Sequence, residues 1–176
     1  INTAVIDALN ATWDAMIAEG QPFAMTETEV RGIPMRVFTS APPDMRFIWE
    51  MSAGHGDKPY IVFEDEEMSY GEAHATVRSL AAYLVEQGVQ PGDRVAIAMR
   101  NYPEWMLAYW ACTSVGIAAV GVNAWWTGPE LVYGIQDSDP GVILADAERL
   151  DRIATHADEI GERILVGVRL PEPRAG

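Results

Sequence analysis

The chain has 176 residues, of which 49% are hydrophobic and 9% aromatic, values typical of a globular domain whose core is large enough to fold without disulfides. Asp and Glu number 26 against 12 Lys and Arg, so the formal net charge is −14. A nucleic-acid-binding protein needs a basic surface that follows the phosphate backbone, and this composition argues against that class.

Residues 1–50 are predicted to form a helix and an arm that precede the main domain. Before Gly20 and Pro22, apolar residues recur at helical spacing, at Val5, Ile6, Leu9, Trp13, Met16 and Ile17. This segment has no Lys or Arg, which membrane-surface helices usually carry, so we expect the helix to pack on its own domain. Residues 21–44 are predicted to be irregular, apart from a short extended segment at 33–38, and residues 45–54 to form a short helix.

The N-terminal residues do not resemble a signal peptide, because they have no basic lead and no long apolar run. The cytoplasm is therefore the expected location, and peripheral membrane association stays open.

Residues 51–176 are predicted to form an α/β subdomain that begins with a hairpin. Residues 60–63 read as a strand, and residues 66–70 turn back from it. Ser69 and Glu72 have the spacing of a capping box, which predicts a helix that Gly88 ends.

Residues 93–130 form the centre of this prediction, because positions 105–129 carry no formal charge. The run is long enough to cross a bilayer, but Gly116, Gly121 and Asn123 interrupt it. A strand at 95–99, a helix with Pro103 in its first turn and a strand at 117–122 explain it better than a transmembrane span. Cys112 lies inside the run and reads as a small buried residue rather than a nucleophile.

The last third of the chain continues the alternation of strands and helices. Thr127 and Glu130 have a second capping-box spacing, and strands are predicted at 142–145 and 164–168 with Asp146 capping the helix between them. This alternation predicts an α/β fold with a parallel sheet and flanking helices.

Ligands of such sheets bind beyond the carboxyl ends of the strands. The residues there form a candidate pocket rim, namely Asn101, Asn123, Trp125 and Trp126, with Arg100 and Asp146 beside them. Each also has a structural interpretation as a helix cap, a turn residue or a core filler. No phosphate-binding glycine motif, metal-ligand pattern or nucleophile motif is present, so the residues alone predict no catalytic, cofactor-binding or metal-binding residue.

Several segments match a known family in order and spacing: EMSYGE at 67–72, GVQPGDRVAI at 88–97, NYPEW at 101–105, ACTSVGIAAVGVN at 111–123, Glu130-Leu131 and DSDP at 137–140. Together they resemble the N-terminal part of the acyl-CoA synthetases, members of the AMP-binding, adenylate-forming superfamily that also holds luciferases and peptide-synthetase adenylation domains. The resemblance covers about residues 58–168. Gly121 departs from it, since the family commonly has proline there.

The resemblance implies a full-length ligase that joins a fatty acid to ATP with magnesium, forms an acyl-adenylate, and passes the acyl group to coenzyme A. The family's phosphate loop should follow a segment like 164–168, and Lys58, the one lysine, matches none of the family's catalytic positions. The chain is therefore expected to be an N-terminal fragment that stops before the ATP phosphate loop, is inactive alone and binds no cofactor itself.

Two other interpretations stay open. The chain could be a non-catalytic α/β module that docks a partner chain through the Trp125–Trp126 edge or a bare sheet edge, or a small domain that binds an acyl chain there. A homodimer through the exposed sheet edge or through swapped N-terminal arms is a further expectation.

Overall fold

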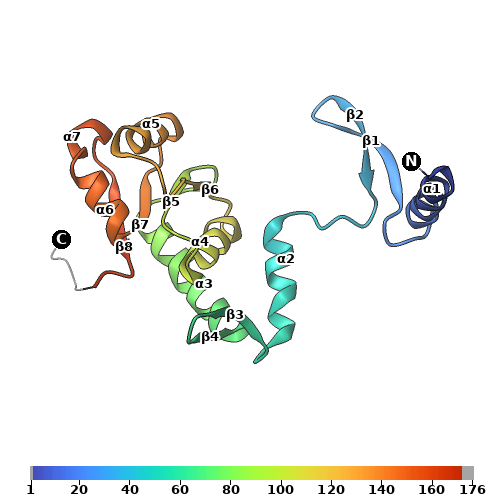
Figure 1. Cartoon of the computed structure of the whole chain (residues 1–176), viewed down its shortest axis with the longest axis horizontal. Helices are drawn as coiled ribbons and strands as arrows, with labels where there is room; N and C mark the ends of the chain where they lie inside the picture. Colours follow the sequence, from blue (N-terminus) through green and yellow to red (C-terminus); the bar gives the residue numbers. More distant parts are fainter. Residues whose placement is uncertain (1, 172–176) are drawn as a thin grey trace. The chain divides into compact units, whose positions relative to one another are not determined.

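The computed structural model describes residues 2–171, and the chain divides into two units, residues 1–44 and residues 45–176. In the first unit, α1 spans Thr3–Ile17, and an antiparallel hairpin joins β1 (Met25–Val30) to β2 (Ile33–Phe38) (Figure 1).

This hairpin corrects the prediction that residues 21–44 are largely irregular. Val30 pairs with Ile33, which leaves Arg31 and Gly32 as a two-residue loop with φ of 52° and 81°. Positive φ at both loop residues gives the turn whose twist matches that of a hairpin. The segment MTETEV has too few apolar residues to show the alternation by which a strand is usually recognised.

The first unit by itself leaves α1 uncovered, since none of the residues of α1 is buried. Ala24 is the one hydrophobic residue of residues 2–44 that is buried. A helix and a two-stranded hairpin have too little surface to enclose a core, which explains why the apolar side of α1 is uncovered.

The second unit begins with a helical layer and a hairpin. Their elements are α2 (Met45–Ser52), the 3₁₀ turn η1 (Ala53–His55), β3 (Pro59–Phe63), β4 (Glu66–Ser69) and α3 (Tyr70–Glu86). The predicted capping box starts α3: the Glu72 amide donates to Ser69 Oγ at 3.2 Å, and the Ser69 amide donates to the Glu72 carboxylate at 2.9 Å.

A four-stranded parallel sheet follows, in the order β6-β5-β7-β8. Its strands are β5 (Arg94–Ala98), β6 (Ala118–Gly121), β7 (Val142–Asp146) and β8 (Ile164–Val168), and its helices are α4 (Pro103–Ser114), α5 (Gly128–Ser138), α6 (Ala147–Ala154) and α7 (Ala157–Ile160). The predicted parallel α/β fold is confirmed. The uncharged run 105–129 is a helix, a strand and a turn, as predicted.

The two faces of β5 show how helices sandwich the sheet. Val95 and Ile97 join a core cluster with residues of α3 and α4, whereas Ala96 and Ala98 join a second cluster with residues of α5 and α6 (Figure 1). All four side chains are fully buried, as expected for a parallel strand covered on both faces. No helix within residues 2–171 has the length and apolar character needed to cross a membrane.

Candidate functional site

The chain adds strands to the sheet first on one side of β5 and then on the other. It leaves β5 through α4 to reach β6 on one side, then returns past β5 to β7 and continues through α6 to β8. Because α4 and α6 pack on opposite faces, the carboxyl ends of β5 and β7 form a topological switch point, where open α/β sheets bind ligands.

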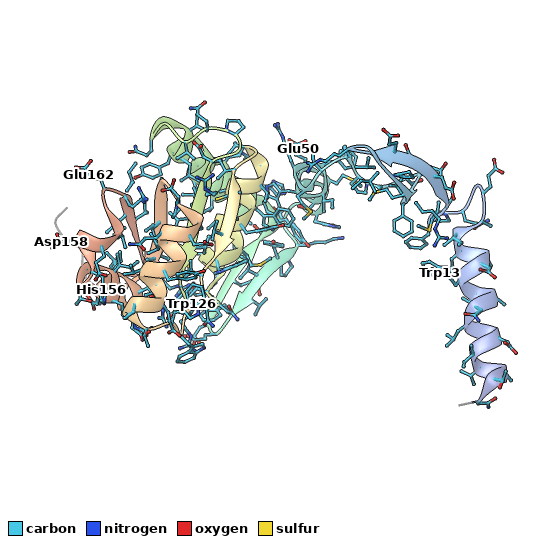
Figure 2. All side chains as sticks on the ribbon, turned by 90° about the horizontal axis from the view of Figure 1, so that it is seen from above. Trp13, Glu50, Trp126, His156, Asp158 and Glu162 are labelled. Carbon is cyan, nitrogen blue, oxygen red and sulfur yellow. The ribbon has the colours of Figure 1, made fainter. Side chains whose placement is uncertain are left out.

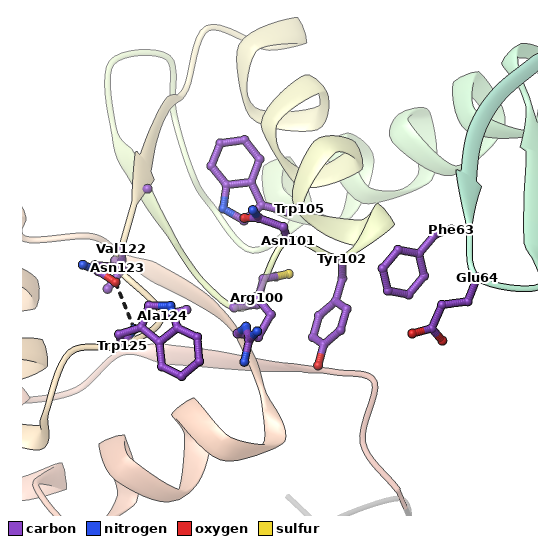
Figure 3. Close-up of a pocket in the computed structure, with 12 residues that line it drawn as sticks. Phe63, Glu64, Arg100, Asn101, Tyr102, Trp105, Val122, Asn123, Ala124 and Trp125 are labelled. Atoms are coloured by element: carbon purple, nitrogen blue, oxygen red, sulfur yellow. Dashed lines mark hydrogen bonds between the residues drawn. The ribbon is translucent and has the colours of Figure 1, made fainter.

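A cavity of about 800 Å³ opens at this edge of the sheet (Figure 3). It is lined by residues from the β3–β4 turn, the segment after β5, the start of α4 and the segment after β6: Phe63, Glu64, Met99, Arg100, Asn101, Tyr102, Trp105, Gly121, Val122, Asn123, Ala124 and Trp125. We call it the strand-end cavity. Its volume is sufficient for a small organic ligand.

Three of the four predicted rim residues line this cavity, namely Asn101, Asn123 and Trp125. Asn123 also serves its turn, since its Oδ1 accepts the Trp125 amide at 2.9 Å. Trp125 is 68% exposed, so its ring presents a large apolar surface to solvent. An aromatic ring and amide side chains together suit a ligand with both apolar and hydrogen-bonding parts.

Trp126 is not among the residues that line the cavity. Its ring packs over Gly134 of α5, where a Cβ would lie 2.5 Å from the indole, and it is partly buried against the core cluster on that face. Trp126 was predicted at the rim because it lies beside Trp125 in the sequence, but the two neighbouring side chains pack in different places. Gly134 makes room for the indole, and Trp126 covers the edge of the core.

Arg100 supplies positive charge to the cavity. Its guanidinium carbon lies 4.2 Å from the centroid of the Trp125 ring, in cation–π geometry (Figure 3). Among residues 2–171, the Arg100 side chain forms no ion pair. A carboxylate or phosphate that entered the cavity could therefore bind Arg100 without displacing a protein carboxylate.

The wall formed by Phe63 and Glu64 was not predicted from the sequence, because their hairpin forms a sheet of its own. Arg169, just after β8, secures it by donating to both oxygens of Glu66 at 2.7 Å and to Glu104 at 2.8 Å. These hydrogen bonds lower the pKa of Glu66 and raise the pKa of Arg169. The guanidinium also lies 5.3 Å from the Phe63 ring centroid, so one side chain joins β8, α4 and the hairpin.

Cys112 is the one cysteine of the chain. Cys112 is fully buried in the core, and burial raises the pKa of its thiol to about 12, which makes it a poor nucleophile. Among residues 2–171, no three His, Cys, Asp or Glu side chains gather closely enough to hold a metal ion.

Comparison with known proteins identifies this architecture. The family described as AMP-binding enzyme matches residues 48–174. The chain belongs to this family. Its fold is that of the N-terminal domains of adenylate-forming enzymes: the N-terminal domain of FACL13 from Mycobacterium tuberculosis superposes with a TM-score of 0.66 at 22% identity, over 72% of this chain and 34% of that one. The anthranilate CoA ligase AuaEII superposes with a TM-score of 0.68 at 21% identity, over 71% of this chain and 25% of that one.

Curated relatives of the chain include a fatty-acid–CoA ligase and an acetyl-coenzyme A synthetase. The medium/long-chain-fatty-acid–CoA ligase FadD6 of Mycobacterium tuberculosis is 32% identical over 105 residues, which are 60% of this chain and 18% of that protein. The acetyl-coenzyme A synthetase of Streptomyces coelicolor is 37% identical over 99 residues, 53% of this chain and 15% of that protein. The chain thus spans less than a fifth of the length of these two relatives.

Proposed function

We propose that this chain forms part of the N-terminal domain of an ATP-dependent acyl-CoA ligase, and that the strand-end cavity is one wall of its ligand-binding site. The observation that carries the proposal is the cavity itself, because it lies at the carboxyl ends of β5 and β6, beside the switch point of a family fold, and is lined by Arg100, two amides and aromatic rings. The reaction of the full-length protein would join a fatty acid to ATP as an acyl-adenylate and then to coenzyme A.

In this proposal the described residues bind and orient but do not react. Arg100 offers a cation for a carboxylate or phosphate, Asn101 and Asn123 offer hydrogen bonds, and Trp125 offers an apolar face. ATP, Mg²⁺ and coenzyme A are cofactors of the proposed full-length enzyme, and no residue of this chain is assigned as a ligand of Mg²⁺.

The catalytic part of the proposal is tested by ATP–pyrophosphate exchange. The 176-residue chain, given ATP, Mg²⁺ and a panel of fatty acids, should show no exchange above a blank without protein. Where the reading frame continues without interruption past Gly176 into a Ser/Thr/Gly-rich loop, the longer protein should show ATP–pyrophosphate exchange. Substantial exchange by the 176 residues alone would contradict the proposal that they are inactive.

The binding part is tested by tryptophan fluorescence. Titration with fatty acids, AMP and coenzyme A should change the emission of the chain, and Trp125→Phe should abolish most of the change. Trp13→Phe, which removes an exposed tryptophan of the first unit, is the matched control and should leave the change intact (Figure 2). Unchanged tryptophan emission with every ligand would contradict the proposal that the cavity binds them.

Two further expectations belong to this proposal. The edge strands of the described sheet are β6 and β8, and an uncovered edge favours self-association. Light scattering should therefore detect a dimer at high concentration, and a strictly monomeric chain would count against it. A cytoplasmic location is likewise a prediction, to be checked by fractionating cells that express the protein.

A further inference from the structure

A buried ion pair lies at the switch point, beneath the strand-end cavity. Asp146 ends β7 and Arg149 lies in the first turn of α6; they are 4% and 1% exposed, and Arg149 Nη1 is 3.1 Å from Asp146 Oδ2. The same nitrogen also donates to the exposed carboxylate of Glu148 at 2.9 Å, so Asp146 is the buried partner of the two. Desolvating two charges is costly, and a pair of apolar residues of similar volume would often stabilise a core equally well. Stability alone therefore does not explain the pair, and its hydrogen bonds to neighbouring segments indicate a second role.

Asp146 connects β7 to the segment that follows β5. Its Oδ2 accepts the backbone N–H of Arg100 at 3.0 Å, while its Oδ1 accepts the backbone N–H of Arg149 at 3.0 Å. The same carboxylate therefore caps α6 and fixes the point where the chain leaves β5 toward the cavity.

Arg149 connects α6 to the segment that follows β6. Its Nε donates to the carbonyl of Ala124 at 2.8 Å, and its Nη2 donates to the same oxygen at 2.5 Å. Arg152, one turn further along α6, donates to the carbonyls of Ala124 at 3.2 Å and Trp126 at 2.7 Å. Ala124 lies between Asn123 and Trp125, so the guanidinium sets the backbone that carries both cavity side chains.

We infer that the Asp146–Arg149 pair positions the strand-end cavity, by holding the Arg100–Asn101 and Asn123–Trp125 segments at a fixed separation. The pair contacts the backbone of both segments and lines no part of the cavity, so its members are positioning residues. The inference rests on the proposed function only for the use of the cavity. Arginine suits the role because its planar fork directs one nitrogen to the carboxylate and two to the carbonyl, which the single ammonium of lysine does not do.

The test compares Arg149→Lys with Ile153→Val in chains labelled with 5-fluorotryptophan, read by ¹⁹F NMR. Ile153 is buried on the same helix, so its variant perturbs the packing of α6 while leaving the ion pair in place. The Trp125 resonance is assigned from its loss in Trp125→Phe. It should shift or broaden in Arg149→Lys and stay in place in Ile153→Val, while the Trp49 and Trp110 resonances stay in place in both.

An unchanged Trp125 resonance in Arg149→Lys would overturn the inference, and so would an equal shift in Ile153→Val. If Arg149→Lys does not fold, Asp146→Asn gives the same readout with little change of shape. The unmodified chain supplies a third measurement: the Arg100 amide should exchange with solvent deuterium at least about tenfold more slowly than an unstructured amide, because a buried carboxylate accepts it. Fast exchange would overturn the inference without any variant.

These readouts need no ligand. A chain that binds neither fatty acid, AMP nor coenzyme A, yet shows the Trp125 shift, would refute the proposed function of the cavity and leave the positioning role in place.

Discussion

The two units of the chain both contain elements rich in apolar residues, with opposite results. In α1, Leu9 and Trp13 recur at helical spacing and are 64% and 50% exposed, whereas Val95 and Ile97 of β5 are fully buried. The difference is the number of layers: β5 lies in a sheet covered on both faces, while residues 2–44 form a helix and one hairpin. Periodicity predicts an element, and burial depends on what the rest of the unit can place against it.

The largest effect is expected in the centre of the second unit. Ile97→Ala removes most of a fully buried side chain from β5, one of the two central strands of the sheet, and leaves a gap beneath α3 and α4. The free energy of unfolding should fall by about 2–5 kcal/mol, measured by urea denaturation. Ile97→Val, the matched control, should cost about 0.5–1.5 kcal/mol. A loss below about 1 kcal/mol for the alanine variant would show that this core can collapse around the gap.

The capping box of α3 supplies the next effect. Ser69→Ala removes the Oγ that accepts the Glu72 amide and should cost about 1 kcal/mol of unfolding free energy. Ser79→Ala is the control in the same helix, because the Ser79 hydroxyl donates only to the Ala75 carbonyl one turn earlier. It should change stability by less than about 0.5 kcal/mol, since alanine is the better helix former. Equal losses for both variants would mean that the cap itself contributes nothing.

The third effect concerns the long-range polar contacts of the second unit. Arg169 lowers the pKa of Glu66 by hydrogen bonding, so this contribution to stability is present above the ordinary pKa of 4.5 and is lost as pH falls through the lowered value. In Arg169→Ala, the pKa of Glu66 should return toward 4.5, followed by ¹³C NMR of the side-chain carboxyl.

Arg163→Ala is the control for this titration, since Arg163 pairs with Asp139 and leaves Glu66 untouched. Arg169→Lys keeps the charge and loses the two-pronged geometry, so it should give an intermediate pKa for Glu66. A pKa of Glu66 that is the same in all three variants would show that Arg169 does not secure the hairpin.

The sequence predicted the second unit well because its signals are local. Capping boxes gave the starts of α3 and α5, and hydrophobic runs gave the strands of the parallel sheet. The strand-end rule named Asn101, Asn123 and Trp125 because it needs only the order of strands and helices. Such local signals do not predict contacts between segments that are far apart in the sequence.

Phe63 and Glu64 belong to a hairpin whose Glu66 accepts two hydrogen bonds from Arg169, 103 positions further along the chain. No periodicity in one segment reports such a contact. β1 was missed for a different reason: its side chains are mostly polar and alternate weakly, and the Arg31-Gly32 turn that joins it to the more apolar β2 is a short signal.

The smallest effect is expected in α1, and it tests the comparison most directly. Leu9→Ala removes a large apolar side chain, as Ile97→Ala does, but from a position that is 64% exposed. Alanine has the higher helix propensity, and surface substitutions usually change stability by less than about 0.5 kcal/mol, so urea denaturation should detect almost no change. A loss of unfolding free energy above about 1 kcal/mol would mean that α1 is covered in solution. The difference in burial between α1 and β5 would then describe the first unit taken alone and not the protein in solution.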